Sequence, residues 1–163
     1  MTRDVEKVYA RAAELNADHP EWKYGILISN FAEEDVVKKA LPDWKIGYNG
    51  KNAVANGDYG AWFAGKCKSL EAACSVYGSQ GLELDCPIVL FGGGYIRQNG
   101  QWVTNGYSYN RLKSKFKDPD TIVENNFRVL LSRARKEMIL LIPKDTILDE
   151  TYQYFIAMGM DEL

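Results

Sequence analysis

The chain has 163 residues, of which 46% are hydrophobic and 26% are charged, and this composition fits one globular domain over residues 1–163. The formal net charge of −2 gives no overall attraction to phosphate backbones, so nucleic-acid contacts would need a local basic patch. No apolar run approaches the roughly 18 residues that span a bilayer, and the charged start lacks a signal-peptide core. We therefore expect a cytoplasmic protein that does not contact a membrane.

Cysteine and histidine usage argues against several kinds of site. The three cysteines are an odd number without a CxxC spacing, and the single histidine, His19, precedes Pro20 in an expected loop. These features disfavour a disulfide framework, a zinc site and a histidine-dependent catalytic triad. The sequence therefore predicts no metal site within this chain.

The first third of the chain reads as helix, strand and helix. Apolar residues at helical spacing predict an amphipathic helix over 4–15, and a continuous apolar run predicts a strand over 25–29. A capping-box-like start predicts a helix over 32–41. A further strand is possible at 44–48, and the Gly- and Asn-rich segment 47–66 reads as a loop with one short helix.

The remainder of the chain alternates apolar runs with helical patterns. Strands are expected at 73–77, 87–91 and 138–142. Helices are expected at 121–135 and 145–158, and a long polar and aromatic loop or insertion is expected at 92–120. Continuous apolar strands that alternate with amphipathic helices predict a mainly parallel sheet covered on both faces, a three-layer α/β sandwich.

The stretch VYGSQGLELD follows one of the expected strands. Ligands of parallel sheets bind at the carboxyl ends of strands, and glycines such as Gly78 and Gly81 allow a phosphate or sugar to approach the backbone. Gln80 supplies an amide, and Glu83 can accept a hydrogen bond from a ribose hydroxyl. The alternative is a glycine-containing hairpin or bulge whose acidic residues are only solvated.

The stretch NNFRVLLSRARKEMILLIP predicts a helix that covers the sheet. On a helical wheel, Arg128 and Arg135 lie on one flank of its apolar face and Arg133 lies on the other. An arginine presented across a domain boundary can neutralise charge on a transferring phosphoryl group. The alternative is that all three arginines are surface cations that complement the helix dipole.

Together, the two stretches resemble a known family. SVYGSQGLELD resembles motif V of superfamily 1 helicases, and FRVLLSRARKEMILLIP resembles motif VI with its following strand. With FGGGYIRQNGQWVTN, the chain is most similar to a large bacterial group of helicase-like ATPases of uncharacterised function. The resemblance covers residues 22–158 and implies a RecA-like fold of the P-loop NTPase superfamily, corresponding to the second, C-terminal motor domain.

The resemblance also implies roles in nucleotide binding. It places Gly81 near the γ-phosphate and Glu83 near the ribose, with Gln80 coupling nucleotide to nucleic acid. It makes Arg133 the arginine finger and gives Arg135 a supporting position beside the nucleotide.

Nucleic-acid contacts are expected at two places. The resemblance puts Ser75 where many relatives have a threonine that holds a nucleic-acid phosphate, and Tyr77 where many have histidine. Within 92–120, basic residues alternate with aromatic ones, a pattern that suits single-stranded DNA or RNA. The basic residues are Arg97, Arg111, Lys113, Lys115 and Lys117, of which the three lysines are the expected contacts. The alternative for this segment is a solvated insertion with a small aromatic core.

Two motifs of an ATP site are absent from the sequence. It contains no GxxxxGK[ST] loop and no apolar strand that ends in an Asp-Glu pair to hold Mg²⁺. The resemblance therefore implies that ATP and Mg²⁺ bind only together with an N-terminal P-loop motor domain, and that the isolated chain is inactive. Two other interpretations are a noncatalytic α/β interaction module and a self-sufficient nucleotide-binding enzyme.

Overall fold

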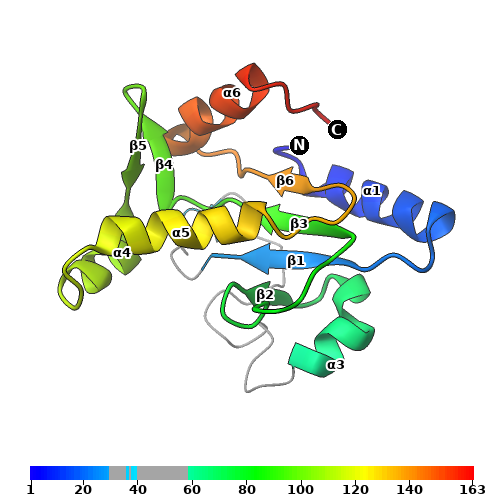
Figure 1. The fold of residues 1–163 in the computed structure, drawn as a ribbon. Coiled ribbons are helices and arrows are strands. Elements are labelled where there is room, and N and C mark those ends of the chain that lie inside the picture. Colours follow the sequence, from blue (N-terminus) through cyan, green and yellow to red (C-terminus); the bar gives the residue numbers. More distant parts are fainter. Residues whose placement is uncertain (30–35, 37, 40–58) are drawn as a thin grey trace.

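A parallel β-sheet forms the centre of the protein in a computed structural model that describes residues 1–29, 36, 38–39 and 59–163 (Figure 1). In the described residues its strand order is β2-β1-β3-β6, with β1 at Tyr24–Ile28, β2 at Ala73–Ser75, β3 at Cys86–Leu90 and β6 at Ile139–Leu141. Every residue of β1, β3 and β6 is buried, as expected for parallel strands covered on both faces. The three-layer α/β class predicted from the sequence is confirmed.

Helices cover both faces of this sheet. Helix α1, Val5–Asp18, covers one face of the sheet. Its buried residues Val8, Ala12 and Leu15 belong to the same core cluster as Ile26, Ile88 and Leu141 of the strands. On the opposite face lie α5, Pro119–Leu131, and α6, Asp149–Ala157. Because neighbouring strand residues point to opposite faces, each central strand contributes to both cores.

Helix α1 confirms the first expected helix and extends it by one turn. The Asp4 carboxylate accepts a hydrogen bond from the Glu6 backbone N–H at 2.9 Å and caps the helix. Before the helix, Thr2 pairs with Leu141 in a parallel bridge, so the chain start extends the sheet beyond β6. Tyr9, one of the apolar residues in the predicted pattern, is 38% exposed.

The segment 92–120 is not a simple loop. It holds an antiparallel hairpin of β4, Tyr95–Gln98, and β5, Gln101–Thr104, followed by α4, Gly106–Lys113. Asn99 and Gly100 form its two-residue turn with φ of 53° and 77°, the positive values that such turns favour. The turn docks on α6, because the Glu150 carboxylate accepts hydrogen bonds from the N–H groups of both turn residues at 2.8 and 2.7 Å.

Several expectations fall on the rest of the chain. The predicted helix 32–41 and strand 44–48 lie outside the described residues, apart from 36, 38 and 39. Within the described part of 47–66, α3 occupies Tyr59–Ala64, and a short 3-10 helix, η1, begins at Lys66 and ends at Ser69. A second 3-10 turn, η2, covers Thr146–Leu148 before α6. Across the described ranges, the helices are too short or too polar to cross a membrane.

Candidate functional site

The two motif-bearing stretches lie side by side, although they are about fifty residues apart in the chain. Leu84 and Ala134 form a parallel bridge just before β3 and β6 begin. The Arg135 backbone N–H donates to the Leu84 carbonyl at 2.9 Å, and the N–H groups of Lys136 and Glu137 donate to the Asp85 carbonyl at 3.0 and 3.1 Å. The structure therefore joins SQGLELD to LLSRAR at the amino edge of the sheet.

Helix α5 ends earlier than the sequence pattern predicted. Its last turn tightens, because the Ser132 and Arg133 N–H groups donate to the carbonyls of Val129 and Leu130, both at 3.3 Å. The chain then leaves the helix to pair with Leu84. The predicted helix 121–135 is wrong at its carboxyl end, and the flank argument fails for Arg133 and Arg135 because neither residue is helical.

Arg133 is half-buried immediately beyond this helix end. Its Nε atom is buried and has no hydrogen-bond partner, and no ion pair of Arg133 occurs among the described residues. Arg128, by contrast, stays on α5 and pairs with Glu124 at 2.7 Å. A buried donor without a partner costs free energy, and guanidinium does not deprotonate in proteins. Arg133 is thus a half-buried arginine whose Nε donor has no partner among the described residues.

Glu83 and Arg135 face each other across the junction. Their side chains approach to 3.9 Å and are 69% and 57% exposed, so the pair adds little stability. Gly81, two residues before Glu83, has a φ of +77° and open space around it. Gln80 is exposed next to it. These four predicted nucleotide-site residues are therefore accessible, and two of them form an ion pair.

Ser75 and Tyr77 lie at a different edge. Ser75 ends β2 in register with Ile28, at the carboxyl side of the sheet, and its hydroxyl accepts from the Gly78 N–H at 3.3 Å. Tyr77 is 59% exposed. The segment from Ser75 to Leu84 thus begins at the carboxyl edge of the sheet, after β2, and ends at the amino edge, before β3. The expected position at a carboxyl strand end therefore holds for the beginning of VYGSQGLELD, whereas Glu83 lies beside the amino edge.

Gly78 has a packing reason that the sequence did not reveal. A side chain at this position would collide with the ring of Tyr59, the first residue of α3. The contact joins residues nineteen positions apart in the chain, so the local pattern gave no signal for it. Gly78 therefore serves close packing, and the prediction that it admits a ligand receives no support.

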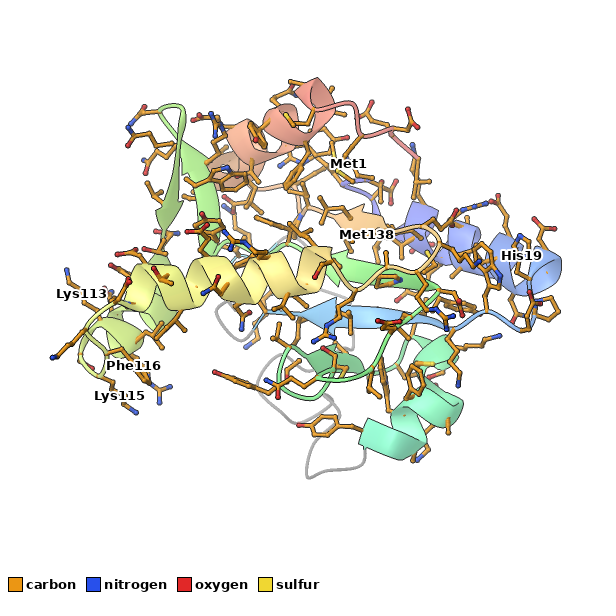
Figure 2. The ribbon with its side chains drawn as sticks, viewed as in Figure 1. Met1, His19, Lys113, Lys115, Phe116 and Met138 are labelled. Carbon is orange, nitrogen blue, oxygen red and sulfur yellow. The ribbon has the colours of Figure 1, made fainter. Side chains whose placement is uncertain are left out.

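The three lysines form a separate exposed group. Lys113 ends α4, and Lys115 and Lys117 follow it on the surface. Figure 2 shows Lys113, Lys115 and the half-exposed Phe116 at the projecting end of α4, well away from Met138 near the start of β6. The structure does not bring these lysines to the junction of SQGLELD with LLSRAR.

One buried polar contact was not anticipated. The Ser29 hydroxyl, at the carboxyl end of β1, donates to the Asn126 side-chain oxygen on α5 at 2.8 Å. Both residues are nearly inaccessible, so the contact fixes α5 along the sheet. The described cysteines are also buried, and burial raises the pKa of Cys74 to about 12, which keeps this thiol protonated and unreactive.

The chain was also compared with known protein families. Residues 1–144 match the family described as Schlafen group 3, DNA/RNA helicase domain. The chain belongs to this family. The matched range of this Schlafen group 3 helicase domain includes both motif-bearing stretches and β6, and leaves η2 and α6 outside. No curated protein and no solved structure gives a significant match.

Proposed function

We propose that this domain is the second motor domain of a superfamily 1 helicase-like ATPase and supplies Arg133 as the arginine finger. The partner is an N-terminal P-loop motor domain of the same protein, which provides the phosphate loop and the Mg²⁺ ligands. ATP is bound between the two domains. Glu83 accepts from the ribose, and Gly81 lets the backbone approach the γ-phosphate.

The observation that carries this proposal is the buried and unpaired Nε of Arg133. The Nε of Arg3 is also buried without a partner, but its terminal nitrogens bind Asp149 and two backbone carbonyls. Arg133 has an unpaired buried Nε and no hydrogen bond or ion pair from the rest of its guanidinium within the described residues. An anion such as the transferring phosphoryl group would satisfy it, and a guanidinium fork matches phosphate geometry.

The Glu83–Arg135 pair fits the same site. Its weak, exposed geometry lets Glu83 exchange one partner for another at small cost. Binding of a ribose hydroxyl by Glu83 would release Arg135 toward the phosphates. Single-stranded DNA or RNA contacts Ser75 and Tyr77 at the opposite edge and the lysines at the end of α4.

Nucleotide hydrolysis by the 163-residue chain tests the shared site. Without a phosphate loop or metal carboxylates in its sequence, the chain should bind ATP weakly and show no steady turnover with Mg²⁺. Addition of the P-loop domain should restore hydrolysis. Steady turnover by the chain alone, at a rate proportional to chain concentration through purification, would show that it is a self-sufficient enzyme.

A further inference from the structure

An aromatic pocket lies outside the proposed nucleotide site. It has a volume of about 500 Å³, within the range of small-ligand sites. It is an open pocket bordered by α5, α6 and the β4–β5 hairpin, and six rings line it: Phe91, Tyr95, Trp102, Phe127, Tyr154 and Phe155. Phe127 belongs to the stretch NNFRVLLSRARKEMILLIP, and the other five rings lie outside both motif-bearing stretches and the lysine group.

The rings hold one another in fixed orientations. Tyr95 stacks on Trp102 with centroids 5.0 Å apart and planes 15° apart, and Tyr154 meets Trp102 edge-on at 5.3 Å. The Arg97 guanidinium covers the Tyr154 ring at 4.3 Å. Because the hairpin is also hydrogen-bonded to Glu150, the pocket is already formed without a ligand.

The charged residues that line the pocket favour a neutral ligand with both hydrogen-bond donors and acceptors. Glu124 and Arg128 line it as a 2.7 Å ion pair, so they present an acceptor and a donor with no net charge. A phosphate would gain little from a neutral pair. A flat heteroaromatic ring can stack on the aromatic side chains while its edge bonds both groups, whereas an aliphatic side chain would leave them unused.

We propose that this pocket binds a single nucleobase. The inference rests on the nucleotide and nucleic-acid binding proposed above, but not on catalysis by Arg133. The base belongs either to single-stranded DNA or RNA or to the ATP bound at the proposed nucleotide site. Leu131 and Ser132 line the pocket directly before Arg133 in the chain, so a bound base contacts the same helix end that positions the arginine.

Fluorine NMR of the 163-residue chain labelled with 5-fluorotryptophan tests this proposal. The four tryptophans give separate signals, and loss of one signal in Trp102→Phe assigns Trp102. A short oligothymidylate or ATP without Mg²⁺ should shift the Trp102 signal and leave that of Trp62, which is 2% exposed, in place. A strand of equal length with abasic sugars should not shift it.

The two base-containing probes distinguish the source of the base, since a shift with oligothymidylate indicates a strand and a shift with ATP alone indicates the nucleotide. For the probe that binds, Trp102→Leu should reduce affinity about tenfold with an unchanged salt dependence. The proposal is overturned if neither probe moves the Trp102 signal, or if the abasic strand moves it equally. Because hydrolysis is not measured, failure here leaves the role of Arg133 to its own test.

Discussion

At the residue scale, Arg133 differs from the other arginines near it. Arg128 has an ion-pair partner on its own helix, and Arg135 has Glu83 across the junction. Arg133 keeps a buried Nε that no described group satisfies. The place of Arg133 in LLSRAR predicts a finger role, whereas the helical wheel gives this prediction no support because the residue lies beyond the helix.

Gly81 is the position where backbone conformation decides the cost of a substitution. Its φ of +77° is open to glycine and strained for alanine, although nothing would collide with the new side chain. Gly81→Ala should therefore reduce the free energy of unfolding by roughly 1 kcal/mol, as measured by denaturant titration.

Gly60 provides the matched control for that measurement. It lies in α3 and also has open space around it, with no positive φ. The same substitution there should raise the free energy of unfolding by about 0.5 kcal/mol, because alanine favours helix. If Gly81→Ala raises the free energy of unfolding as Gly60→Ala does, the positive φ described at Gly81 is wrong.

At the element scale, the sequence predicted what depends on local periodicity. The apolar runs located β1, β3 and β6, because strands buried on both faces have continuous apolar sequences. The helical spacing located α1, because a helix buried on one face has apolar residues every three or four positions. The Asn-Gly pair at 99–100 is a typical hairpin turn sequence. The prediction missed it because the aromatic and basic residues of this segment were interpreted as a nucleic-acid-binding loop.

The carboxyl end of α5 could not be predicted from local apolar spacing. Its apolar pattern continues through Ala134, but the backbone of this segment pairs with Leu84. A nonlocal strand-like bridge therefore overrides local helical spacing. For the same reason, the sequence predicted the candidate site residues individually, but not that Glu83 and Arg135 form a pair.

The exposed end of α4 gives a prediction for nucleic-acid binding. In the complete protein, replacing Lys113, Lys115 and Lys117 together with alanine should weaken single-strand binding. It should also reduce the slope of log affinity against log salt by about 2, because each lost phosphate contact contributes about 0.7. Equilibrium titrations at several salt concentrations measure both quantities.

The control must remove the same charge elsewhere. Lys7, Lys136 and Lys144 are exposed and lie away from α4 in sequence, and their joint replacement should leave the slope unchanged. An equal slope in the parent and the α4 variant would mean that these lysines are solvated and do not contact a strand.

At the scale of the whole molecule, the sheet separates two groups of candidate residues. The arginines and Glu83 lie where β3 and β6 begin, whereas Ser75 and Tyr77 follow the carboxyl end of β2. The turn between Ser75 and Leu84 connects both edges. A nucleotide bound at one edge and a single-stranded nucleic acid bound at the other would therefore be linked through ten residues of one covalent segment.

Single-turnover ATP hydrolysis by Arg133 variants of the complete two-domain protein tests the central claim most directly. Arg133→Ala and Arg133→Lys should each lower the hydrolysis rate about 10³-fold, because lysine lacks the planar fork, while ATP affinity falls far less. Lys136→Ala, an exposed residue in the same segment, should hydrolyse ATP at the parent rate. A folded Arg133→Ala variant that hydrolyses ATP near the parent rate would show that Arg133 is not the finger.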